Sequence, residues 1–254
     1  MKKICLTIAG LDPSGGAGII ADVKTFSAFG CFAAAAVSSV TFQSTTGVFG
    51  AVHQSAESVR RQIEPVLDDY DVAAVKTGML PTREIIEEVA KIIKERGLKN
   101  VIVDPVVRST SGFDLVDEKA LEAIIEKLFP LADLITPNLP EAERITQIKI
   151  DSTEAIEKAA GIMRVLGAYY VLIKGGHPLS AEAKARSATD YLFVGETMHV
   201  FEGEFIEDAP THGTGCRLSS AIAANLALGN DLPDSVKIAK DFVTEAIISD
   251  IRNS

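Results

Sequence analysis

The residues with the clearest chemical capacity lie at 212–216, where the sequence reads His-Gly-Thr-Gly-Cys ahead of an apolar, helix-spaced run. Glycines before a helix let backbone N–H groups converge on an anion, and the helix dipole favours negative charge there. The same field is expected to lower the pKa of Cys216 in the first helical turn. The segment therefore predicts an oxyanion cradle beside a proton acceptor. The alternative is an ordinary helix start in which Cys216 is a small core residue.

Other polar segments follow directly after short apolar runs that are expected to be buried strands. They lie at 10–18, 76–79, 104–106, 136–141 and 174–177. Ligands of open α/β sheets bind outside the carboxyl ends of the strands. These segments are therefore predicted to converge on one crevice together with 212–216.

The glycine-rich segment at 10–18 precedes a helix expected to begin near Ile19. It lacks the Gly-Lys-Ser/Thr ending of a P-loop and does not fit G-x-G-x-x-G, so it predicts no nucleotide fingerprint. Its glycines either let the backbone approach a flat ligand closely or form a plain tight turn.

Charged residues in the remaining segments each allow two interpretations. Asn138 and Glu141 are one turn apart at a helix start, where the carboxylate can hold Mg²⁺ or close a capping box. Lys174 at the end of a strand can meet phosphate oxygens or be a solvated charge. Asp104 is either a functional carboxylate or a turn residue before Pro105.

The elements that must position these residues alternate along the chain. Buried strands are predicted at 4–9, 72–76, 101–103, 134–135 and 170–173, and helical spacing marks 85–93, 121–128 and 156–163. This alternation predicts an α/β fold with a mainly parallel sheet covered by helices on both faces. Two strand pairs break the pattern, 33–43 with 47–53 and 189–194 with 197–201. The first pair is expected to project from the sheet as a subunit contact or a partial cover over the site.

Composition limits the classes of partner and the compartment. A net charge of −10 argues against non-specific binding to nucleic acid or to an anionic membrane. Three widely separated cysteines suggest neither a disulfide framework nor a metal cluster, so a reducing cytosol is expected. The apolar run after Met1 is shorter than a usual signal segment, and no run approaches the ~20 apolar residues of a spanning helix. Without repeats or linkers, residues 1–254 are predicted to form a single domain.

Taken in order, these segments resemble the hydroxymethylpyrimidine/phosphomethylpyrimidine kinases of thiamine synthesis, which belong to the ribokinase-like superfamily. The matching words lie at 9–19, 21–28, 75–80, 103–106, 135–143, 174–177 and 211–216. The resemblance implies a ribokinase-like fold with a small extra β-element. It also implies ATP-dependent phosphorylation of 4-amino-5-hydroxymethyl-2-methylpyrimidine and of its monophosphate, by a protein expected to be a cytoplasmic homodimer.

The resemblance also assigns the site residues. It implies a substrate pocket formed by Gly10, Asp22, Gln43, Met79 and Val106, with Cys216 at the reacting hydroxyl. It implies an ATP site that uses Asp104, Asn138, Lys174, His212 and the backbone amides of Gly213, Thr214 and Gly215, with Mg²⁺ near Glu141. The amide of Gln43 suits an aminopyrimidine edge because it offers both a donor and an acceptor. Met79 is either a soft surface for a flat ring or a filler of the core.

The sequence departs from the common family pattern at three places. Leu11 stands where Ser or Thr is frequent, and the segment 108–112, which contains Thr110, lacks a lysine that Arg108 can replace in charge. Arg217 replaces the usual Thr after the cysteine and is expected to add a cation near the phosphates.

Three rival functions remain open. A pyridoxal or pyridoxine kinase on the same scaffold is the nearest, with dual specificity as a variant of it. A non-catalytic pyrimidine-binding module would not need Lys174, Glu141 and the glycine segment. A thiol enzyme would pair Cys216 with His212 as nucleophile and base.

Overall fold

The computed structural model describes residues 2–44, 47–108, 112, 114–175, 187–206 and 212–253. Within these residues, nine strands form one sheet in the order β3-β2-β1-β4-β5-β6-β7-β8-β9. The strands are β1 (Ile4–Leu11), β2 (Phe32–Ser44), β3 (Gly47–His53), β4 (Val72–Thr77), β5 (Val101–Val103), β6 (Leu134–Ile135), β7 (Tyr170–Gly175), β8 (Ser187–Val194) and β9 (Thr197–Glu204). Every strand predicted from the sequence is present.

The interior of the sheet is parallel and its two margins are antiparallel. Strands β2, β1, β4, β5, β6 and β7 run parallel, whereas β3 pairs antiparallel with β2, and β8 and β9 form an antiparallel hairpin beside β7. The predictions of a mainly parallel sheet and of a hairpin formed by 189–194 and 197–201 are confirmed, and the structure adds that this hairpin lies at one margin of the sheet.

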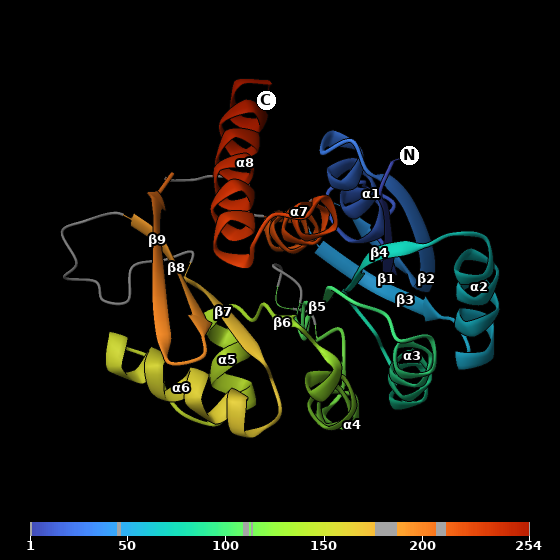
Figure 1. The fold of residues 1–254 in the computed structure, drawn as a ribbon, viewed down its shortest axis with the longest axis horizontal. Coiled ribbons are helices and arrows are strands. Elements are labelled where there is room, and N and C mark those ends of the chain that lie inside the picture. Colours follow the sequence, from blue (N-terminus) through green and yellow to red (C-terminus); the bar gives the residue numbers. More distant parts are fainter. Residues whose placement is uncertain are drawn as a thin grey trace.

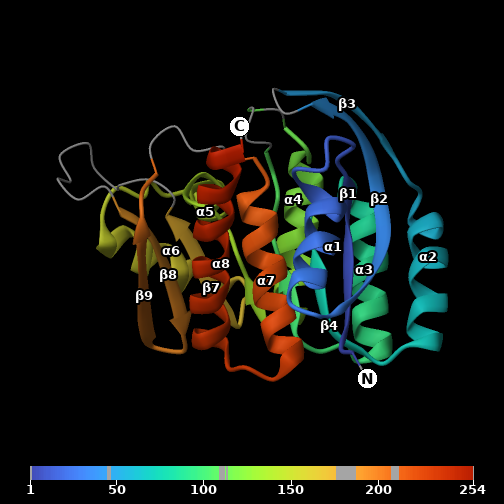
Figure 2. The ribbon, with the colours of Figure 1, turned by 90° about the horizontal axis from the view of Figure 1, so that it is seen from above.

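The strand pair expected at 33–43 and 47–53 is present, but the prediction that it projects from the sheet holds only for part of it. The first part of β2, from Phe32 to Val40, pairs with β1 inside the main sheet, and only Ser39 to Ser44 pair with β3. The reason lies in the alanines of β2, since Ala34 and Ala36 pack into the core on one face of the sheet and Ala33 packs against the core on the other. A strand covered on both faces belongs in the body of a sheet. Figure 2 shows β3 beyond the end of β1.

Helices cover both faces of the sheet. Helices α1, α7 and α8 lie on one face and α2 to α6 on the other (Figure 1), and each layer has its own apolar core. The α-helices are α1 (Gly18–Ala28), α2 (Ala56–Asp69), α3 (Arg83–Arg96), α4 (Glu118–Ala123), α5 (Leu139–Thr146), α6 (Thr153–Val165), α7 (Thr214–Leu228) and α8 (Leu232–Asn253). The helical run expected at 121–128 changes character, because α4 continues as the π-helical η1 (Ile124–Leu128) and the 3-10 turn η2 (Phe129–Leu131).

The helices differ in how they begin. Ser55, Thr82, Asp117 and Ser152 cap α2, α3, α4 and α6 by accepting a hydrogen bond from a first-turn N–H group. Helices α1 and α7 begin instead at Ala17 and Gly213, without a side-chain cap. These two helices carry the glycine segments, and their N-termini lie at the carboxyl edge of the parallel strands. None of the described helices combines the length and apolar character needed to cross a membrane.

Candidate active site

The carboxyl edge of the sheet gathers polar groups around Asp104, which follows β5. Its Oδ1 accepts hydrogen bonds from Lys174 Nζ at 2.8 Å and from Thr136 Oγ1 at 3.0 Å. Its Oδ2 accepts one from Ser219 Oγ of α7 at 3.2 Å. Three strand ends and one helix therefore meet at a single buried carboxylate, as the spacing of the polar segments predicted.

Lys174 brings its charge to the first turn of α7. A side chain at Gly215 would place its Cβ 3.2 Å from Lys174 Nζ, so the glycine leaves room for the ammonium group. Burial opposes the charge of Lys174, but Asp104 and then Glu141 outweigh it and raise the pKa above its usual value. A charged ammonium and a helix N-terminus thus face the same space, which suits phosphate oxygens.

Asn138 and Glu141 form the capping box that was one of their two interpretations. Asn138 Oδ1 accepts from the Glu141 N–H at 2.8 Å, and Glu141 Oε2 accepts from the Asn138 N–H at 2.8 Å. Burial raises the pKa of Glu141 to about 7; Asp104 adds to that rise, while Lys174 opposes it. The capping interpretation is confirmed, and the carboxylate also borders the space beside Lys174 and Asp104.

Cys216 lies half-buried in the first turn of α7. The pKa of its thiol is raised, so the predicted lowering is wrong. Desolvation by the surrounding protein is the main cause, and it outweighs the charge of Lys76 and the N–H group of Gly18, both of which stabilise the thiolate. The sequence argument counted the helix dipole and omitted the cost of removing the thiolate from water.

Beneath this turn lies a second polar cluster, centred on Asp22 of α1. Asp22 Oδ2 accepts from Thr7 Oγ1 at 2.6 Å and from Lys76 Nζ at 2.9 Å, and Oδ1 accepts from Ser220 Oγ at 2.7 Å and Lys76 Nζ at 3.0 Å. The side chains of Asp22 and Lys76 are both 0% exposed. Asp22, which the resemblance assigned to the substrate pocket, therefore lies below the surface of the site rather than on it.

The glycine segments 10–18 and 212–216 are in close contact at the start of α7. Gly213 has a φ of +77°, and a Cβ there would lie 1.9 Å from the carbonyl oxygen of Gly16. His212 Nε2 lies 2.8 Å from Asp12 Oδ2, and Asp12 also accepts from the N–H group of Ala17 at 2.9 Å. His212, assigned to the ATP site, thus joins the segment 212–216 to the first glycine loop, while Thr214 begins α7.

The remaining residues assigned to the substrate pocket come from the ends of four strands, β1, β2, β4 and β5. A Cβ at Gly10 would lie 3.1 Å from Met79 Sδ, so the backbone of β1 and the thioether are in close contact. Met79 is buried, and its carbonyl accepts a hydrogen bond from Ser38 Oγ at 2.6 Å. Gln43 is half-buried near the end of β2, opposite Val48 of β3, and Val106 is half-buried after β5.

The residues that depart from the family pattern form hydrogen bonds within the protein. Arg217 Nη1 donates to Asp250 of α8 at 2.8 Å, so its charge is directed to that helix and not to the phosphate site as predicted. Arg108 Nε donates to Asp114 at 2.8 Å. The carbonyl of Leu11 accepts from Thr41 Oγ1 at 2.9 Å. Thr110 lies outside the described residues, as do positions 176, 177 and 211 of the matching words.

Sequence reasoning missed the residues that support the site from below. Lys76 was placed only within the segment 76–79 expected at the crevice, and Ser219 and Ser220 received no role, although each carries a hydrogen bond to Asp22 or Asp104. A signal was available, because Lys76 directly follows the apolar run 72–75 within the same strand, and a buried lysine needs a counterion.

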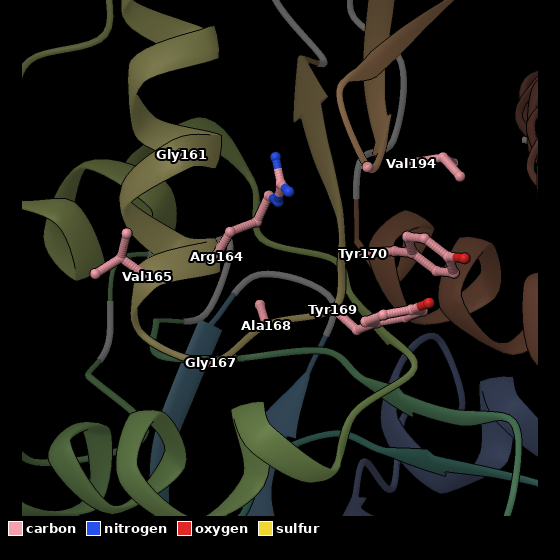
Figure 3. Close-up of a pocket in the computed structure, with 9 residues that line it drawn as sticks. Gly161, Arg164, Val165, Gly167, Ala168, Tyr169, Tyr170 and Val194 are labelled. Atoms are coloured by element: carbon pink, nitrogen blue, oxygen red, sulfur yellow. The ribbon is translucent and has the colours of Figure 1, made fainter.

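A pocket of about 750 Å³ lies at the opposite edge of the sheet (Figure 3). It is lined by Gly161, Arg164, Val165, Gly167, Ala168, Tyr169, Tyr170, Val194 and Gly195. Tyr170 is the first residue of β7, whereas Lys174 lies near the carboxyl end of that strand. The pocket is therefore separate from the cluster around Asp104.

The fold and site define a phosphotransferase of the ribokinase-like class. A crystal structure of phosphomethylpyrimidine kinase from Clostridium difficile matches with a TM-score of 0.84 and 41% identity, covering 97% of this chain and 100% of that one. The chain belongs to the phosphomethylpyrimidine kinase family, whose pattern matches residues 12–253. Hydroxymethylpyrimidine/phosphomethylpyrimidine kinase from Rhizobium meliloti is 45% identical over 97% of this chain and 91% of its own length. An ADP complex of Bacillus subtilis pyridoxal kinase is also similar, with 38% identity and a TM-score of 0.85 over 96% of this chain and 91% of that one.

Proposed function

We propose that this kinase transfers the γ-phosphoryl group of ATP to the hydroxymethyl group of 4-amino-5-hydroxymethyl-2-methylpyrimidine, and then a second phosphoryl group to the monophosphate, in thiamine biosynthesis. Besides family membership, the observation that carries the proposal is the meeting of Lys174, Asp104 and the N-terminus of α7 beside Cys216. This arrangement offers positive charge to a phosphoryl group next to a group that can take a proton.

Positioning and charge stabilisation supply most of the rate in phosphoryl transfer. The amides of residues 213–216 and the ammonium of Lys174 would hold the γ-phosphoryl oxygens as their charge redistributes. A well-placed donor of this kind contributes roughly 3–4 kcal/mol, by analogy with oxyanion holes. The hydrogen bonds from Lys174, Thr136 and Ser219 to Asp104 fix the position of that ammonium group relative to α7.

Cys216 would accept the proton of the substrate hydroxyl as the new O–P bond forms. Its pKa is raised, so the thiolate is the minor form at neutral pH, and the fraction that reacts grows as the pH rises. We therefore expect kcat to increase with pH from neutrality into the alkaline range. The measurement is the pH profile of kcat beside that of Cys216→Asp, whose carboxyl group ionises at lower pH. Superimposable profiles would contradict the assignment.

We further infer that Mg²⁺ binds near Glu141. A buried carboxylate whose pKa is raised to about 7 by burial and by Asp104 is a site where a cation is favourable. Mg²⁺ binds through one or two carboxylates together with phosphate oxygens and water, and it would neutralise phosphate charge when bound. Glu141, with Asp104 nearby, would hold it on the side of the site that Lys174 borders.

Glu141→Gln is expected to raise the Mg²⁺ concentration needed for half-maximal activity. Glutamine retains the return hydrogen bond of the capping box, so the substitution removes the charge and leaves the start of α5 intact. The measurement is a Mg²⁺ titration of the initial rate at saturating ATP, with thermal unfolding as the control for helix stability. An unaltered titration would leave Glu141 with its capping role alone.

We propose that the chain forms a homodimer through the outer surface of β2 and β3. Phe42, Phe49 and Val52 are 53%, 75% and 54% exposed on this marginal strand pair, where β3 ends the sheet. Exposed apolar side chains on an edge strand favour pairing with another chain. Phe49→Glu is expected to give monomers in light scattering, whereas Val165→Glu, at an 89% exposed position on α6, should not. An unchanged mass for Phe49→Glu would contradict this interface.

Two coarser expectations accompany the proposal. One continuous sheet across the described residues supports a single domain over 1–254. The three cysteines are unpaired thiols, which suits a cytoplasmic enzyme.

The test of the proposed function is a product assay. The purified protein would be incubated with MgATP and either the pyrimidine alcohol or pyridoxal, and the products would be resolved by mass spectrometry. The proposal predicts that the pyrimidine gains one and then two phosphoryl groups. Phosphorylation of pyridoxal alone would favour the rival function, to which the similar Bacillus subtilis pyridoxal kinase also points.

A further inference from the structure

We propose that Lys76 is a positioning residue for the reaction: held by Asp22 below the first turns of α7, its buried charge stabilises the thiolate of Cys216. The inference rests on the proposed function, in which that thiolate accepts the hydroxyl proton. It assigns a role to a lysine that lies one layer beneath the site.

The contacts of α7 place Lys76 on the side of the helix that carries the thiol. Ser220 follows Cys216 by four residues, so the two side chains share one face of α7. Ser220 Oγ donates to Asp22 Oδ1 at 2.7 Å, and Lys76 Nζ donates to both oxygens of Asp22 at 3.0 and 2.9 Å. Lys76 is therefore connected, through Asp22, to the face of α7 on which Cys216 stands.

The backbone that follows β4 leaves little room around the ammonium group of Lys76. A Cβ at Gly78 would lie 2.9 Å from Lys76 Nζ, so the glycine after β4 makes room for the group. The side chains of Lys76 and Asp22 are 0% exposed, and charges buried in this way act on one another much more strongly than charges in water. A cation fixed in such a place can influence a thiol in the next layer.

Lys76 remains charged despite its burial. Desolvation alone would lower the pKa of Lys76, but Asp22, Cys216 and Asp104 together raise it above its usual value. Asp22 by itself balances the lysine when Cys216 is a thiol. When the thiol ionises, the ammonium group of Lys76 is the charge that most favours the thiolate.

The charged and polar groups around Cys216 determine how readily its thiol ionises. Asp22 and Asp104 disfavour the thiolate and add to the effect of burial, whereas Lys76 is the largest influence that favours it, followed by the N–H group of Gly18. Lys174, from β7, also interacts with the thiol. Removing the charge of Lys76 therefore leaves a thiol that ionises at still higher pH.

The test measures the thiol directly and needs neither ATP nor the pyrimidine. The rate of iodoacetamide alkylation at Cys216 would be followed against pH by mass spectrometry, in wild type and in Lys76→Met. We expect the midpoint to move to higher pH in the variant, so that alkylation at about pH 8 slows roughly tenfold or more, because the thiolate is the reacting form. Cys216→Ala supplies the blank for Cys5 and Cys31, which are buried.

Asp22→Asn provides a second variant with the opposite expectation. It removes a negative charge facing the thiol and leaves Lys76 without its counterion, so alkylation should become faster at the same pH. A merely structural role would disturb the site in the same direction in both variants. If Lys76→Met does not fold, the double variant Asp22→Asn/Lys76→Met, which removes both buried charges together, is compared with Asp22→Asn: slower alkylation in the double variant supports the inference, and equal rates overturn it.

A matched control uses another buried ion pair. Lys240 Nζ of α8 lies 2.7 Å from Asp190 Oδ2 of β8, and neither residue is among the groups that act on Cys216. Lys240→Met should lower stability and leave the alkylation midpoint unchanged. An unchanged midpoint in folded Lys76→Met would overturn the inference. A shifted midpoint together with full activity of Cys216→Ala would instead remove the proposed base and leave the effect of Lys76 on the thiol established.

Discussion

Cys216→Ala is expected to lower kcat by about 10²–10⁴-fold, the usual contribution of a general base. The substitution removes the thiol and leaves the backbone of α7, so the amides at its N-terminus and Lys174 keep their positions. ATP affinity should therefore change little. Steady-state kinetics gives kcat, and calorimetric titration with ATP gives the affinity.

The control for this substitution is Cys31→Ala. Cys31 is a buried thiol whose Sγ lies 3.9 Å from the carbonyl oxygen of Ala224, in the C-terminal half of α7 and about two turns from Cys216. Its replacement should lower stability through lost packing without changing kcat. An unchanged kcat in Cys216→Ala would remove the base assignment, and a parallel loss of ATP affinity would show that the helix start had been disturbed.

Gly213→Ala is the second change for which a large loss of activity is expected. Gly213 has a φ of +77°, and a Cβ would lie 1.9 Å from the carbonyl oxygen of Gly16, so either the first glycine loop or the start of α7 must move. Displacing a donor from the phosphate cradle is expected to lower kcat by roughly 10²–10³-fold, as loss of an oxyanion-hole donor does. The measurement is kcat, together with the free energy of unfolding.

Gly229→Ala separates backbone strain from damage to the site. Gly229, at the C-terminal end of the same helix, also has a positive φ, +96°, but no described atom lies within 4 Å of its added Cβ. This variant should cost about 1–2 kcal/mol in stability because of its left-handed conformation, with kcat unchanged. Equal losses of kcat in the two glycine variants would mean that strain in α7, and not the cradle, determines activity.

The sequence predicted the convergence of the site well, because that prediction depends only on chain order and topology. Asp104, Asn138 and Lys174 each follow a buried strand, and parallel strands bring their carboxyl ends to one edge. That arrangement explains the hydrogen bond from Lys174 to Asp104 and the contact of Gly10 with Met79. The order of strands and polar residues along the chain therefore predicted that these side chains lie at the same edge of the sheet.

What could not be predicted was the balance of charge and burial around each group. The raised pKa of Cys216 results from desolvation by residues distant in sequence, and the burial of Asp22 depends on Thr7, Lys76 and Ser220 converging from three elements. The position of β2 inside the sheet could not be predicted either. A run of alanines does not alternate between polar and apolar residues, so the sequence does not indicate whether one face of the strand or both are buried.

The most direct test of the whole account is a crystal structure of the complex with the pyrimidine alcohol and a non-hydrolysable ATP analogue. The account predicts the ring between Gly10, Met79 and Gln43, the γ-phosphoryl oxygens on the amides of 213–216, and the substrate hydroxyl within hydrogen-bonding distance of Cys216 Sγ. A substrate hydroxyl directed at another residue, or a pyrimidine bound in the pocket beside Tyr169, would contradict it.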